Sequence, residues 1–116
     1  MRKIRSSLVG VDQGSVVLFS DFQDGGEMWT GTGPRECRRP VVFSEPYLSP
    51  PVVQAHMAMW DMDSDSNGRA DLAAEDVTAQ GFTIVFRTWS DTRVARVRAD
   101  WMAVGGIAGE DDWDIS

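Results

Sequence analysis

Cysteine, histidine and lysine each occur only once in this 116-residue chain. Cys37 has no second cysteine to pair with, so stability must come from packing or assembly rather than from an intrachain disulfide. His56 stands within an apolar, strand-like stretch, where a single histidine is more typical of packing or of an interface than of catalysis. Arginine supplies nearly all of the positive charge, and its planar guanidinium suits bidentate and interface contacts.

Motifs of enzymatic chemistry are also missing. The sequence has no P-loop, no zinc-ligand spacing and no serine-centred elbow. Cys37 stands among Arg35, Arg38 and Arg39, which would lower the pKa of its thiol, but it has no histidine partner. We therefore predict that the protein is not an enzyme and needs no cofactor.

Long apolar runs are absent as well. The apolar part of the N-terminus, 8–11, is far shorter than a secretory signal core and is interrupted by Gly10. The sequence predicts no signal peptide and no membrane insertion, and it leaves open a location outside the cell or on a particle. The net charge of -7 disfavours binding to nucleic acid, because an acidic surface repels phosphates.

The residues that are present indicate one all-β domain. Stretches rich in β-branched and aromatic residues, separated by turn residues, predict strands over 15–20, 41–44, 52–63, 69–77, 81–89 and 93–104. No window has a helical period, and residues 21–36 form a long loop. The last strand alternates, with Ala95, Val97, Ala99 and Trp101 facing the core and an outward row of Val94, Arg96, Arg98 and Asp100. This pattern is typical of an antiparallel sandwich or barrel.

The stretch "DSDSNGRADLAAE", residues 63–75, resembles a calcium-binding loop. The position of its closing glutamate holds Ala74, and Glu75 comes one residue late. The flanking segments are predicted strands rather than helices, and Asp, Ser, Asn and Gly are typical turn residues. We predict the turn of a hairpin without a metal, with a calcium site as the alternative.

Five tryptophans are a high number for this length. Trp60 and Trp101 lie within strands and are predicted to belong to the core. Trp29 and Trp89 lie in or beside loops. An exposed indole stacks on the apolar face of a pyranose, and neighbouring arginine and aspartate side chains bind its hydroxyls. The two loop tryptophans therefore indicate a sugar-binding site.

The order of these motifs resembles the H-type lectin domain family over Gln13 to Gly105. The most specific features are the pairs Gly81-Phe82 and Thr88-Trp89, the closing Trp101 and a proline-rich signature of Phe43, Pro46, Pro50, Pro51 and Val52. The resemblance implies a six-stranded antiparallel β-sandwich that forms a trimer. It also divides the chain into an N-terminal arm (1–12), the lectin-like domain (13–105) and an acidic C-terminal tail (106–116).

The resemblance also implies sites between subunits for galactose-type sugars, often N-acetylgalactosamine. Carried over by position, the ligand arginine is Arg69 and the stacking tryptophan is Trp89. The next position, a sugar-binding histidine in a snail member of the family, is Ser90 here, and a later aromatic is Ala95. The predicted sugar-binding residues are completed by Asp91 and, from the first long loop, by Asp24, Trp29 and Thr32.

Two functions compete at this point. The first is a multivalent lectin, without catalysis, that binds galactose-type or related glycans; a trimer raises avidity on a glycan-coated surface. The alternative is a structural trimeric spike or fibre module of a phage-like particle with a lost or altered pocket, which Ser90 and Ala95 favour. Expected partners are glycans and two further copies of the chain, either as a homotrimer alone, as a dimer of trimers or within a larger particle.

Overall fold

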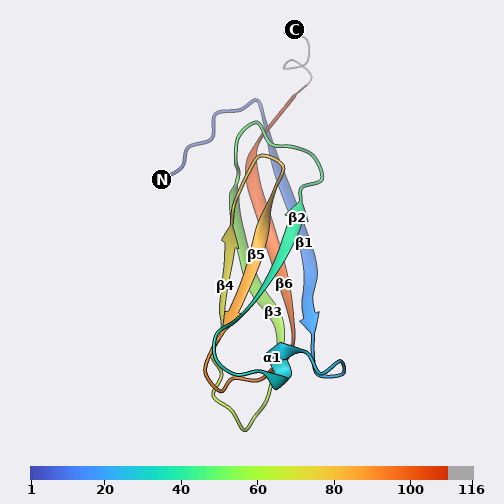
Figure 1. Ribbon diagram of the computed structural model, residues 1–116. Helices are drawn as coiled ribbons and strands as arrows, with labels where there is room; N and C mark the ends of the chain where they lie inside the picture. The colour runs from blue at the N-terminus through green and yellow to red at the C-terminus, as the bar shows by residue number, and fades with distance from the viewer. Residues whose placement is uncertain (110–116) are drawn as a thin grey trace.

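A computed structural model describes residues 1–109. The fold has six strands and one short helix, in the order β1 (Leu8–Ser20), α1 (Glu27–Thr30), β2 (Arg35–Val42), β3 (Val52–Met62), β4 (Asp71–Glu75), β5 (Gly81–Thr88) and β6 (Val94–Ile107). Two three-stranded antiparallel sheets, ordered β1-β6-β3 and β2-β5-β4, face each other (Figure 1). The predicted six-stranded antiparallel β-sandwich is confirmed.

The central strand of the first sheet, β6, alternates as the sequence predicts for most of its length. Val97, Ala99 and Trp101 are buried, and Arg96 is exposed on the other face. The assignment of Val94 to the outward row is wrong, because Val94 is fully buried in the core. A register irregularity where Val94 pairs with β3 breaks the alternation at this point.

The family signature residues form much of the core between the sheets. The Trp101 ring lies 5.4 Å from that of Phe82 and 6.0 Å from that of Phe43. Gly81 is required where β5 meets β2, since a Cβ there would lie 2.2 Å from the carbonyl oxygen of Val41. Gly14 faces Trp101 across the β1–β6 pair, and its missing side chain leaves room for the indole. The signature thus identifies packing positions.

The proline-rich connection between β2 and β3 is fixed to the core by Tyr47. Its ring packs against Phe43 at 5.1 Å, and its hydroxyl donates to the carbonyl oxygens of Gly10 and Ala103 at 3.2 and 3.1 Å. These bonds join the connection to both β1 and β6. The end of the sandwich opposite α1 is therefore closed by a well-packed segment.

Several local predictions need correction. The first strand begins at Leu8 rather than Ser15, because pairing with β6 continues through Gly10 and Gly14. The long loop after β1 contains one helical turn, α1. Trp60 is 57% exposed instead of buried, since β3 is an edge strand with a neighbour on one side only. Trp101 is buried as predicted.

The acidic stretch 63–70 is not the turn of a hairpin. It joins β3 to β4, which lie in different sheets, so it crosses from one layer of the sandwich to the other. β6 continues to Ile107, past the predicted end of the domain, and residues 110–116 of the predicted tail lie outside the described part of the chain. Within residues 1–109, no helix is long and apolar enough to cross a membrane.

Candidate functional site

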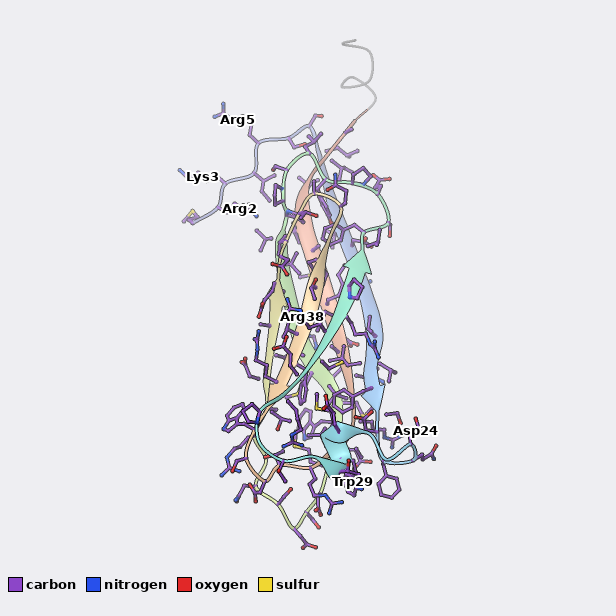
Figure 2. All side chains as sticks on the ribbon, viewed as in Figure 1. Arg2, Lys3, Arg5, Asp24, Trp29 and Arg38 are labelled. Carbon is purple, nitrogen blue, oxygen red and sulfur yellow. The ribbon has the colours of Figure 1, made fainter. Side chains whose placement is uncertain are left out.

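Three loops meet at the end of the sandwich where α1 lies (Figure 1). They are the β1–β2 loop (21–34), the β3–β4 loop (63–70) and the β5–β6 loop (89–93). Every residue that the sequence predicts to bind sugar lies in one of them. We call this the loop end; Figure 2 shows the basic N-terminal residues Arg2, Lys3 and Arg5 at the opposite end.

A buried arginine at the start of β2 holds two of the loops together. Arg35 is 7% exposed, and its guanidinium donates to the carbonyl oxygens of Gly33 (2.9 Å), Met28 (3.1 Å) and Ser90 (3.3 Å). The amide of Gly33 also donates to Ser90 O at 2.9 Å. Gly33 has a φ of 75°, a left-handed conformation that glycine adopts without strain. The β1–β2 and β5–β6 loops therefore form one unit.

The β5–β6 loop presents Trp89, Ser90 and Asp91 in succession. Trp89 is 43% exposed, although the preceding Thr88 is buried. Ser90 has a positive φ of 62°, so the chain turns sharply directly after the tryptophan. The turn places Asp91 close to the β3–β4 loop, where it meets Arg69.

Arg69 and Asp91 form the central ion pair of the loop end, with Arg69 Nη1 2.5 Å from Asp91 Oδ1. The other carboxylate oxygen, Oδ2, accepts from the amide and side chain of Asn67 at 3.4 Å. Among the described residues the guanidinium makes no other hydrogen bond or ion pair, so the rest of its donors remain available. The Arg69 side chain is 32% exposed and the Asp91 side chain 52%.

The backbone of Arg69 is fixed by two threonines, Thr88 of the family signature and Thr92, which the sequence did not assign to the site. Thr88 Oγ1 donates to Arg69 O at 2.6 Å, and the amide of Arg69 donates to Thr92 Oγ1 at 3.2 Å. Thr92 is fully buried and also donates to the carbonyl oxygen of Asn67. These bonds connect the β3–β4 loop to both ends of the β5–β6 loop.

Trp29 belongs to a second cluster at the loop end. Its ring lies edge-on to Phe22 at 4.9 Å, and the guanidinium of Arg93 lies over it at 4.4 Å. Arg93 also donates to Trp29 O at 2.8 Å and lies 3.5 Å from a carboxylate oxygen of Asp63. The guanidinium of Arg93 holds the Trp29 ring in place, and Asp63 holds Arg93 in turn as its ion-pair partner.

Asp24 and Thr32 are exposed, and in the described part of the chain their side chains make no hydrogen bond or ion pair. Figure 2 shows Asp24 on the same side of the molecule as Trp29 and at its edge. Figure 1 shows the start of β4, which follows Arg69, on the other side. One protomer thus brings together Arg69, Trp89, Ser90 and Asp91, but it does not add Asp24 to them.

The ionisation of the site follows from its ion pairs. The hydrogen bond from Arg69 lowers the pKa of Asp91 below its usual range, so Asp91 is an anion near neutral pH. Cys37 behaves differently from the prediction, because burial raises the pKa of its thiol more than nearby Arg39 lowers it. Cys37 is therefore a neutral packing residue. Across residues 1–109, no group of three or more His, Cys, Asp and Glu side chains is placed to hold a metal ion.

The outer face of the β2-β5-β4 sheet carries a continuous ion-pair network next to Trp89. Arg38 lies 2.7 Å from Glu36 and 3.2 Å from Asp76, and Arg87 lies 2.9 Å from Glu75. Val85 lies on this face opposite Arg38 and is fully buried, although it is outside the main core. The arginine stems are long enough to cover such a valine while their charged ends stay in solvent.

Comparisons with known proteins agree with the fold described above. The model of the H-type lectin domain matches residues 38–104, more than half of the chain. A protein named ATP synthase subunits region ORF 7, from Fuscovulum blasticum, is 59% identical over 107 residues that cover 92% of this chain and 93% of that protein. Discoidin-1 of Dictyostelium discoideum is 33% identical over 75 residues, 64% of this chain and 30% of that one.

Solved structures give the same result. Discoidin II of Dictyostelium discoideum superposes with a TM-score of 0.74 at 29% identity, covering 86% of this chain but only 38% of that one. The tailspike protein gp49 of Pseudomonas phage LKA1, with a TM-score of 0.53 at 17% identity, shares the fold alone. The match of the domain model, the core built from the signature residues and the discoidin superposition show that this chain belongs to the H-type lectin domain family.

Proposed function

We propose that the protein is a carbohydrate-binding protein that recognises galactose or N-acetylgalactosamine, or closely related sugars, at the loop end. The observation that carries the proposal is that the exposed Trp89 lies two residues before Asp91, the ion-pair partner of Arg69, and directly after Thr88, which is bonded to the Arg69 backbone. The exposed indole offers an apolar wall for a pyranose ring. The free donors of Arg69 and the acceptors of Asp91 offer the complementary pair that sugar hydroxyls need.

We also propose that the protein acts as a homotrimer assembled through the outer face of the β1-β6-β3 sheet. Large apolar side chains are exposed there, namely Val9, Val11, Val17, Val52 and Met102. On the same face Arg98 Nε and Asp100 Oδ1 form an ion pair at 3.7 Å, too long for a hydrogen bond, and both atoms are buried without a hydrogen-bond partner among the described residues. Burying the apolar patch against another copy and supplying partners for these atoms would both favour association.

A trimer would also explain the position of Asp24. Within one protomer this carboxylate lies on the other side of the molecule from the start of β4 (Figures 1 and 2), and it has no partner among the described residues. In our proposal Asp24 reaches the Arg69–Trp89 site of the neighbouring protomer, with Trp29 and Thr32 supporting its loop. Each site then needs two protomers, and the trimer carries three sites for avidity.

A glycan array with purified protein tests the proposed function. We expect signals on terminal galactose or N-acetylgalactosamine that disappear with Trp89→Ala. Trp60→Ala is the matched control, because Trp60 is an exposed tryptophan of β3 outside the β5–β6 loop. An array without any signal would contradict the lectin assignment and favour a purely structural module. Equal signals from wild type and Trp89→Ala would place the site elsewhere.

A further inference from the structure

A hollow of about 410 Å³ lies on the outer face of the β2-β5-β4 sheet, directly beside Trp89. Its lining residues come from the adjoining ends of β2 and β5, namely Pro34, Arg35, Glu36, Arg87, Thr88 and Trp89. The volume is within the range of about 300–1,000 Å³ that is common for small-molecule sites. None of the sugar-binding residues predicted from the sequence, apart from Trp89, belongs to it.

The strand order places this hollow on the opposite side of Trp89 from Arg69. β5, which leads into Trp89, lies between β2 and β4, and Arg69 precedes β4 whereas Glu36 belongs to β2. Glu36 pairs with Arg87 across the two strands, and Trp89 follows Arg87 by two residues. Side chains two residues apart on an extended chain share a face. The indole therefore stands between two sets of polar groups.

The polar groups of the hollow suit hydroxyls. Arg87 Nε lies 3.4 Å from Glu36 Oε2, and both side chains are more than a third exposed. The guanidinium keeps donors free, and the carboxylate, which also accepts from Arg38, keeps lone pairs free. This combination of an apolar wall, a donor and an acceptor repeats the chemistry on the Arg69 side of Trp89.

The charge of the hollow restricts its ligand. Arg87 is surrounded by three carboxylates, with Glu75 at 2.9 Å, Glu36 at 3.4 Å and Asp71 at 3.9 Å. The guanidinium is thus neutralised before any ligand arrives, and a sialic acid or a sulfated sugar would meet net negative charge. A neutral pyranose meets no such repulsion.

We propose that this hollow is a second sugar subsite, which holds a neutral pyranose next to the one bound by Arg69. The inference rests on the proposed lectin function and extends it. Glu36 and Arg87 are then specificity-determining residues, and the protein prefers neutral oligosaccharides to single sugars. Trp89 contacts both sugars of the ligand.

The test compares an oligosaccharide with its own terminal sugar. The neutral oligosaccharide with the strongest array signal and the corresponding monosaccharide are titrated calorimetrically into wild type, Arg87→Met and Arg38→Met. Arg38 is the matched control, because it also pairs with Glu36 but does not line the hollow. Thermal melts confirm that each variant is folded.

We expect wild type and Arg38→Met to bind the oligosaccharide at least about tenfold more tightly than the monosaccharide, as one charge-assisted hydrogen bond would give. For Arg87→Met the ratio should fall to about one. Sialylated or sulfated forms of the oligosaccharide should bind no more tightly than the monosaccharide. An unchanged ratio in Arg87→Met, or no preference in wild type, would overturn the subsite while leaving the lectin function intact. If wild type bound no glycan at all, both proposals would fall.

Discussion

Replacing Arg35 by methionine should both destabilise the protein and weaken sugar binding. Methionine keeps the length and apolar stem of the side chain but removes every donor. The carbonyl oxygens of Gly33, Met28 and Ser90 would then lose a partner within a largely buried space. Two of these belong to the β1–β2 loop and one to the β5–β6 loop, so the β1–β2 loop would lose its internal support and the two loops would lose one of their links.

The size of the effect follows from the geometry. The bonds to Gly33 O at 2.9 Å and Met28 O at 3.1 Å are well formed, and those to Ser90 O at 3.3 Å and Glu27 O at 3.5 Å are weaker. Hydrogen bonds to a charged group are worth about 1.5–3 kcal/mol each. Counting only the two short bonds at the lower value gives about 3 kcal/mol of unfolding free energy. For a domain of this size, that corresponds to a fall in Tm of roughly 10–15 °C.

Calorimetric melts and sugar titrations measure the two effects separately. Arg39→Met is the matched control, because Arg39 is exposed and donates to a single carbonyl oxygen, that of Leu18. The control should lose no more than about 1 kcal/mol. An Arg35→Met protein with wild-type Tm and affinity would refute the view that this arginine organises the loop end. An Arg35→Lys variant should recover little, because one ammonium cannot reach carbonyls in several directions.

Four further predictions concern the site and the assembly. Arg69→Lys and Arg69→Ala should each weaken sugar binding about ten- to a hundredfold by calorimetry, since a point charge cannot replace the guanidinium fork. Light scattering should give a trimer mass for wild type and a smaller mass for Met102→Glu, which places a charge in the apolar patch. EDTA should leave Tm unchanged, because hydrogen bonds within the 63–70 loop and from Asp63 to Arg93 already fix its conformation. The lowered pKa of Asp91 means that its contribution to stability is fully present above the usual aspartate pKa of about 3.9. This contribution is lost only as pH falls through the lower pKa of the folded state. Tm should therefore show no Asp91-linked decrease between pH 8 and pH 5. A Tm that falls on addition of EDTA would contradict the third prediction. An Asp91-linked change of Tm near pH 6 would contradict the fourth.

The fold was predictable because its signals are local and repeated. Short β-branched segments separated by turns indicate strands, and Trp101 lies in the core as predicted, where it meets the signature residues Phe43 and Phe82. The errors in strand bounds and side-chain orientation occur where pairing with a neighbouring strand, rather than the local sequence pattern, decides the structure. Pairing with β6 extends β1 back through two glycines, and a register irregularity turns Val94 inward. Neither effect can be predicted from a single strand.

The site was predictable only in part. Arg69, Trp89, Ser90 and Asp91 were predicted by position, and the structure places them in two loops joined by the Arg69–Asp91 ion pair, while their role in sugar binding stays a prediction. Arg35 was missed as a link between loops because its partners are backbone carbonyls, which leave no pattern in side-chain sequence. A signal was present, because an arginine that opens a strand directly after a glycine-rich loop is well placed to bind that loop's carbonyl oxygens.

In the proposed trimer the two sheets have different roles, and Asp24 at the loop end connects each site with the neighbouring protomer. The loop end is held by arginine, threonine and backbone hydrogen bonds, and a site ordered before the ligand arrives loses less conformational entropy on binding. The proposed trimer face runs along the β1-β6-β3 sheet, whereas Trp89 and the hollow lie on the β2-β5-β4 sheet. Three copies joined through the first sheet would keep the second sheet exposed on each protomer and direct three loop ends the same way. Weak single sites then act together on one glycan-coated surface, which is the condition under which multivalent binding gains most.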